Sequence, residues 1–205
     1  MVNLKMIRLI FLILIHFSSL TFANDTLKGY QALEEKDYKK ALYYLSYDAN
    51  LGDEKAQYNL GIMYKKGLGV KVNNNEAFRW FFLSANQGNI LANYALGHSY
   101  LKGSGIKQNY KLAFKAFKFS ALREHPSSRL VLGNMYYQGQ GVSINYSKAF
   151  LWWSLAEDIN INGARQNIDM VKKKMSKDEY IRGKEMYSMC MQDTLYNCTK
   201  KIDIF

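Results

Sequence analysis

One short stretch occurs three times in the chain at a constant spacing. Each copy opens with Leu-Gly, has a tyrosine three residues after that glycine, and ends in Gly-x-Gly followed by Val or Ile. The opening glycines are Gly61, Gly97 and Gly133, so consecutive copies are 36 residues apart. Self-similarity at such a period is typical of arrays of stacked supersecondary units, in which each unit buries its apolar face against the next. The repeat therefore constrains the fold more than any other feature of the sequence.

Each unit has the pattern of two helices. The first carries a stripe of Ala or Ser, Leu and Tyr at positions i, i+4 and i+8, which lie on one face of a helix. The members of this packing stripe are Ala56, Leu60 and Tyr64, then Ala92, Leu96 and Tyr100, then Ser128, Leu132 and Tyr136. A glycine follows each Leu inside the helix, where it costs about 1 kcal/mol relative to alanine. Its recurrence predicts a close approach between two helices.

Glycine and asparagine mark the turn within each unit. Gly67, Gly103 and Gly139 are placed to end the first helix in a left-handed conformation. Asn73, Asn109 and Asn145 are placed to start the second helix, because an Asn side chain accepts hydrogen bonds from free amides of the first turn. The Gly-x-Gly runs lack the third glycine of a dinucleotide-binding loop and follow helices instead of strands, so they predict helix ends and not a phosphate site.

The first residues have the pattern of an export signal. Residues 1–8 are basic, residues 9–17 are an apolar run, and a small-residue stretch ends at Ala23, which predicts a signal peptide cleaved there. The alternative is an uncleaved anchor, but the apolar run is shorter than the roughly 20 residues that span a bilayer. We therefore expect a secreted or periplasmic protein. The formal net charge of +11 favours acidic proteins or anionic surfaces as partners.

The repeat resembles the Sel1-like repeat, a relative of the tetratricopeptide repeat. The resemblance rests on Leu-Gly-x-x-Tyr-x-x-Gly-x-Gly, the following Asn, and the Ala-aromatic second helix. It implies an all-α, right-handed α-solenoid of antiparallel helix pairs, and a non-enzymatic adaptor for protein partners. The expected divisions are a signal peptide (1–23), a degenerate repeat (24–53), three repeats (54–89, 90–125 and 126–161), and capping helices with a tail (162–205).

A second stripe on the first helices is the candidate partner-binding surface. In repeats of this type it faces the concave groove, and here it varies between copies while the packing stripe is constant. Exposed aromatic side chains of this kind anchor interfaces. The candidates are Tyr58, Ile62 and Lys65, then Tyr94, His98, Leu101 and Lys102, then Leu130, Asn134 and Tyr137. The lysines favour an acidic ligand; the alternative is that half of these side chains pack within their own unit.

The C-terminal region is expected to close the array with two helices that break near Ser176. Its lysine run, residues 172–174, is either a solvated face or a contact with an anionic envelope surface. Cys190 and Cys198 are the only cysteines, and an even pair in an exported chain favours a disulfide. Their spacing also resembles that of the cysteine-rich subgroup of secreted Sel1-like proteins.

The sequence carries no recognisable catalytic or metal-binding pattern. The expected mature chain has two histidines, His98 and His125, with no His or Cys at ligand spacing, so we expect no metal and no cofactor. We expect a monomer that binds protein and not nucleic acid. The alternative function is a cell-wall ligand binder or a weak β-lactamase, which the resemblance to the cysteine-rich subgroup implies and no residue here supports.

Overall fold

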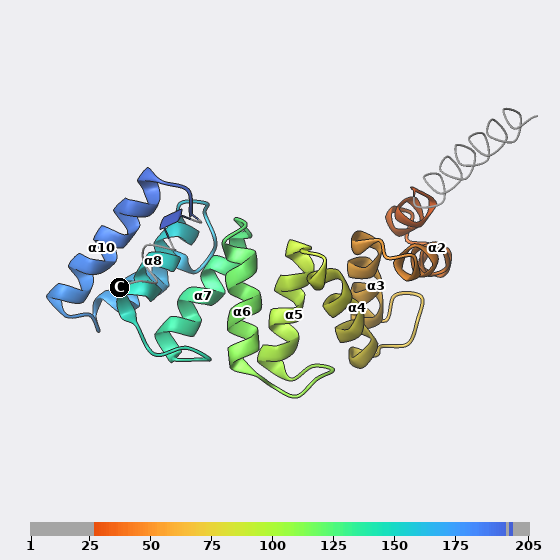
Figure 1. The fold of residues 1–205 in the computed structure, drawn as a ribbon, viewed down its shortest axis with the longest axis horizontal. Coiled ribbons are helices and arrows are strands. Elements are labelled where there is room, and N and C mark those ends of the chain that lie inside the picture. Colours follow the sequence, from red (N-terminus) through yellow and green to blue (C-terminus); the bar gives the residue numbers. More distant parts are fainter. Residues whose placement is uncertain (1–26, 196, 199–205) are drawn as a thin grey trace, which may run out of the picture. The chain divides into compact units, whose positions relative to one another are not determined.

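Paired helices make up the part of the chain that the structure describes (Figure 1). The computed structural model describes residues 27–195, 197 and 198, and within these there is no β-strand. The signal peptide expected at 1–23 lies outside the described residues. After a helical segment over residues 27–34, the helices are α2 (Tyr38–Asn50), α3 (Glu54–Lys66), α4 (Asn74–Asn86), α5 (Ile90–Lys102), α6 (Tyr110–Ala121), α7 (Pro126–Gln138), α8 (Tyr146–Glu157), α9 (Ala164–Lys172) and α10 (Lys177–Gln192).

The chain divides into two units within α4. The first unit is Met1–Trp80 and the second is Phe81–Phe205. In the first unit α2 packs on α3, and small alanines alternate with larger side chains in the core. This core contains Ala32, Ala41, Leu45, Ala49, Ala56, Leu60, Met63 and Trp80.

In the second unit each helix packs on the next. The contacts join α5 to α6, α6 to α7, and α7 to α8, and then α8 to both α9 and α10. Phe117, Leu132 and Trp153 are among the fully buried side chains of this core. Burial of one face of every helix against its neighbours is the expected source of stability in a repeat array.

The predicted helix ends are confirmed. Gly67, Gly103 and Gly139 end α3, α5 and α7 in the left-handed region, with φ of 71°, 70° and 70°. Asn109 and Asn145 accept hydrogen bonds from the backbone N–H groups of Leu112 and Lys148 at the starts of α6 and α8. Asn73 accepts in the same way from Glu76 at the start of α4.

Each of these asparagines also closes the loop in which it lies. The backbone N–H groups of Asn73, Asn109 and Asn145 donate to the carbonyls of Tyr64, Tyr100 and Tyr136 at 3.0, 2.9 and 3.0 Å. One backbone geometry therefore recurs in all three glycine loops.

The glycines inside the first helices lie where two helices approach closely, as predicted. A Cβ atom added to Gly97 would lie 2.8 Å from Cε1 of Phe117 on α6. A Cβ on Gly133 would overlap the indole of Trp153 on α8. No larger residue fits either place without displacing a buried aromatic ring.

Helices α9 and α10 close the second unit, as predicted, and are called the C-terminal cap below. Ser176 starts α10 with a complete capping box, in which Glu179 is the partner. On α8, Ser147 donates its hydroxyl to the carbonyl of Glu179 at 2.8 Å. A disulfide joins Cys190 of α10 to Cys198. Among the described helices none is long and apolar enough to span a membrane.

Candidate functional site

A hollow between α5 and α7 brings together three of the predicted partner-binding residues. His98 and Leu101 reach it from α5, and Asn134 reaches it from α7. Its volume is about 350 Å³. The other lining residues, which the sequence did not single out, are Tyr110, Val131, Met135, Gln138 and Gln140. Corresponding first helices of neighbouring repeats thus form its two walls, and amide and apolar side chains line it together.

The wall from α5 is held in place by contacts between aromatic rings, most of them edge to face. Tyr94 lies with its ring centroid 4.7 Å from that of His98 and 4.4 Å from that of His125. His98 in turn meets the buried ring of Phe117 at 5.0 Å. Tyr94 is half-buried, so its ring supports His98 more than it offers free contact area. The ring contacts of Tyr94, a predicted binding residue, thus lie within its own unit.

The wall from α7 is fixed by hydrogen bonds. The side-chain oxygen of Asn134 accepts from Nε1 of Trp153 at 3.1 Å and from Nδ2 of Asn167 at 3.3 Å. Both donors come from helices that follow α7, so the carboxamide has a defined orientation at the hollow. Such an arrangement is typical of a preorganised contact, because little rotamer entropy is lost on binding.

Tyr137 lies outside the hollow, and its ring also packs against other side chains. Its ring meets those of Tyr146 and Trp153 at 5.7 and 5.6 Å, and Nζ of Lys174 lies 4.7 Å from its centroid. A side-chain hydrogen bond with Tyr137 is the main reason that the pKa of Lys174 is raised above its ordinary value.

The remaining predicted residues are placed as follows. Leu130 on α7 is half-buried, and Lys102 at the end of α5 is exposed. Tyr58, Ile62 and Lys65 lie on α3 in the first unit, where the two apolar side chains are half-buried and the lysine is exposed.

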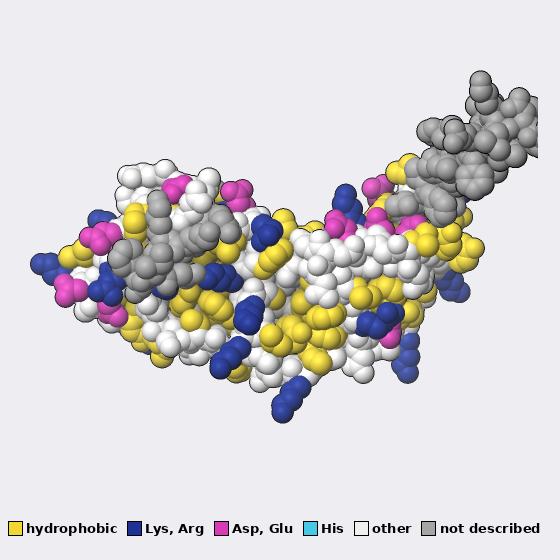
Figure 2. Space-filling model, in the orientation of Figure 1, with side chains coloured by type: hydrophobic (Ala, Val, Ile, Leu, Met, Phe, Trp, Pro, Cys, Tyr) yellow, Lys and Arg dark blue, Asp and Glu magenta, His cyan; other side chains and the backbone are white. Residues whose placement is uncertain are grey.

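The charge around the hollow is strongly one-sided. Within the second unit Glu124 is the only acidic residue from Phe81 to Ala156, and that stretch carries eight Lys and Arg residues. Figure 2 shows more dark blue Lys and Arg side chains than magenta Asp and Glu side chains over α5 to α7. An excess of positive charge in general speeds the encounter with acidic ligands.

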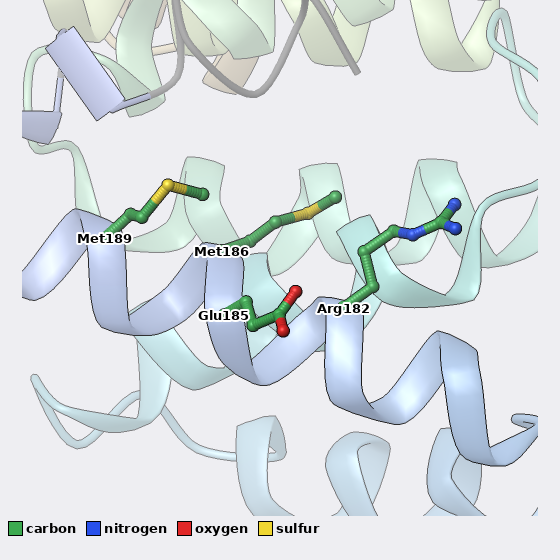
Figure 3. A pocket seen from close by; sticks show the side chains of 4 residues that line it. All are labelled: Arg182, Glu185, Met186 and Met189. Atoms are coloured by element: carbon green, nitrogen blue, oxygen red, sulfur yellow. The ribbon is translucent and has the colours of Figure 1, made fainter.

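A second hollow, of about 520 Å³, lies against α10 in the C-terminal cap. Arg182, Met186 and Met189 extend from one side of the helix, with Glu185 beside them (Figure 3). Over the described residues no three His, Cys, Asp or Glu side chains are grouped so that they could hold a metal ion.

Comparison with known families identifies the repeats. The Sel1 repeat matches residues 27–53, 54–89, 90–122 and 126–159, which is more than half of the chain. The chain belongs to the Sel1 repeat family. Sel1 repeat proteins generally serve as scaffolds for protein–protein interaction and are typically not enzymes. None of the curated proteins matches the chain.

Two solved structures place the Sel1 chain among α-solenoids. A Sel1 repeat protein from Oxalobacter formigenes is 30% identical, with a TM-score of 0.68; the match covers 78% of this chain and 68% of that one. A protective antigen of uropathogenic Escherichia coli, c5321, which displays an SLR fold, is 21% identical, with a TM-score of 0.57; the match covers 81% of this chain and 44% of that one. The Escherichia coli structure supports the fold alone.

Proposed function

We propose that this Sel1 repeat protein is an exported scaffold that holds an acidic segment of a partner protein in the hollow between α5 and α7. The observation that carries the proposal is the hollow itself, which is lined by residues of two neighbouring first helices. The surrounding sequence has many more Lys and Arg than Asp and Glu residues. Leu101 supplies apolar contact, Asn134 and Gln138 supply hydrogen bonds, and Lys102 lies at the rim on α5.

The proposed location outside the cytosol is supported by the disulfide between Cys190 and Cys198, since such bonds persist in oxidising compartments. The intact mass of exported protein tests the signal peptide. A mature chain that begins at Asn24 supports export by cleavage, and retention of residues 1–23 in a membrane fraction would contradict it.

A matched pair of double variants tests the binding site. Leu101→Glu with Lys102→Glu places acidic side chains at the hollow, whereas Lys111→Glu with Leu112→Glu makes the same chemical change on exposed positions of α6. Each protein is used to capture partners from an envelope extract. We expect the variant at the hollow to lose a protein that both the wild type and the α6 variant retain.

Melting curves accompany this comparison, because charge near helix ends changes stability by about 0.3 to 1 kcal/mol. Capture by the wild type should also weaken as salt is raised, since the attraction is electrostatic. If the variant at the hollow folds and captures the same proteins as the wild type, recognition lies elsewhere on the molecule.

A further inference from the structure

The second helices of the terminal repeats share a feature that the middle repeats lack. Two positions, one helical turn apart, recur every 36 residues along the second helices, and both are apolar or aromatic only in the first and the last repeat. In order along the chain the pairs are Tyr43 and Tyr47, Arg79 and Leu83, Lys115 and Phe119, and Leu151 and Leu155.

In the last repeat these positions are covered. Leu151 and Leu155 on α8 are 1% and 5% exposed and belong to one core with Met186 and Cys190 of α10. Helix α10 packs along α8 closely enough that a Cβ on its Gly183 would lie 3.0 Å from the ring of Phe150. The fold of this chain thus shows how an apolar pair at this repeat position is buried, namely by one more helix.

In the first repeat the same positions face solvent. Tyr43 is 73% exposed, Tyr47 is 50% exposed, and Leu51, which continues the row at i+8, is 61% exposed. These three residues are called the α2 stripe below. Large apolar side chains that are grouped on one helical face and remain exposed are typical of an interaction site.

We propose that the α2 stripe binds an amphipathic helix of a partner protein, in the manner in which α10 covers α8. The size of the stripe favours a single helix over a second copy of the chain. Its three side chains expose roughly 350 Å² of surface, if a fully exposed tyrosine side chain has a surface of about 200 Å². A stable dimer, in contrast, buries about 800 Å² on each partner.

The charge next to the stripe specifies the partner helix further. Lys39 and Lys40 are exposed in the first turn of α2, and Lys39 lies one turn before Tyr43 in line with the stripe. The carboxylate of Asp37, which is close to them in the sequence, already accepts from the backbone N–H of Lys40 as the N-cap. The partner helix therefore carries Glu or Asp beside its apolar face, so that the lysines meet opposite charge.

A synthetic peptide tests the proposal on the full exported protein. The peptide has 16 residues, the length of α10, with leucine and methionine along one helical face and glutamates at its edges. We expect it to bind the wild type, and to bind the Tyr43→Ser, Tyr47→Ser variant at least about tenfold more weakly. The matched control, Phe82→Ser with Leu83→Ser on α4, removes two exposed apolar side chains elsewhere and should bind as the wild type does.

Two comparison peptides separate the sources of affinity. A peptide of the same composition with its apolar residues scrambled should not bind, and one with lysine in place of glutamate should bind more weakly. Amide chemical shifts of the wild type should change on α2 when the first peptide is added, a measurement that requires no variant to fold.

The proposal is overturned by either of two results. The first is that the peptide leaves the wild type unbound, or binds the α2 variant and the control alike. The second is a dimer in sedimentation that the α2 variant abolishes, which would make a second copy the occupant. Variants at the hollow between α5 and α7 should leave peptide binding unchanged.

Discussion

Gly141 lies against the backbone carbonyl of Tyr110, with no room for a side chain between them. A Cβ atom on Gly141 would overlap the carbonyl oxygen of Tyr110, and one on Gly69 would lie 2.5 Å from that of Tyr38. Tyr38 and Tyr110 are the first residues of the second helices α2 and α6. The second glycine of Gly-x-Gly therefore joins the loop of one repeat to the start of a helix in the repeat before it.

Gly141→Ala should destabilise the second unit by roughly 3 kcal/mol, because a left-handed φ of 74° and the overlap with Tyr110 act together. Gly163→Ala is the control, since its φ is 87° and a Cβ there would meet no atom within 4 Å. The Gly163→Ala variant should lose only the stability that a left-handed backbone conformation costs an alanine, about 1 to 2 kcal/mol. Denaturant unfolding measures both, and equal losses would show that the contact with Tyr110 relaxes freely.

Gly97→Leu should lower stability by roughly 1 to 3 kcal/mol through overpacking against Phe117. The double variant with Phe117→Ala should recover part of this loss relative to the sum of the single changes, because the space vacated by the ring accommodates the leucine. The coupling energy in a double-mutant cycle is the measurement. Strict additivity would mean that the two residues do not meet.

Stability should fall as the pH drops below about 6.5, partly through His125. His125 is the N-cap of α7, where its Nδ1 accepts from the N–H of Ser128 at 3.3 Å and contacts the hydroxyl of Ser128 at 2.8 Å. Burial lowers the pKa of His125 below its ordinary 6.5, so folding favours the neutral ring. The stabilisation is complete above the unfolded-state pKa and is lost as the pH falls from there toward the lower folded-state pKa.

His125→Asn isolates this contribution, because Asn89 caps α5 at the equivalent place one repeat earlier. Melting midpoints between about pH 7 and 5.5 should decline less in the variant than in the wild type. His98 and the carboxylates are present in both proteins, so parallel declines would remove His125 as a source of the pH dependence.

Reduction of the bond between Cys190 and Cys198 should lower stability by roughly 2.5 kcal/mol, as expected for a short closed loop. The effect should fall on the end of α10, where Cys190 and Cys198 are both buried. Hydrogen exchange with and without a reductant reports it residue by residue. Unchanged protection of α10 would show that packing on α8 alone holds the C-terminal cap.

The repeat, its helix pairs and its capping residues could be predicted from sequence because each depends on local rules that recur in phase. In such a pattern Gly67 is expected to end a helix and Asn109 to start one, and the structure confirms both roles. The N-caps of the first helices were missed since their chemistry changes from copy to copy: Asp53, Asn89 and His125 share a position and no residue type.

The candidate site could be predicted only in part. Periodicity places Tyr94 and Asn134 on the second stripe of their helices, but it does not say what lies opposite them. The ring of Tyr94 packs against His98 and His125, and the side-chain oxygen of Asn134 accepts a hydrogen bond from Nε1 of Trp153. His125 and Trp153 lie far from Tyr94 and Asn134 in the sequence, and a repeat pattern does not specify contacts over that range.

The backbone hydrogen bond from Asn73, Asn109 and Asn145 to the tyrosine of the preceding helix has a consequence for how the sequences of such chains diverge in evolution. It sets the number of residues in each glycine loop, since one insertion would separate the donor from its carbonyl. Lineages should therefore differ by the gain or loss of whole repeats, and by substitution on the exposed faces, with few insertions inside a loop.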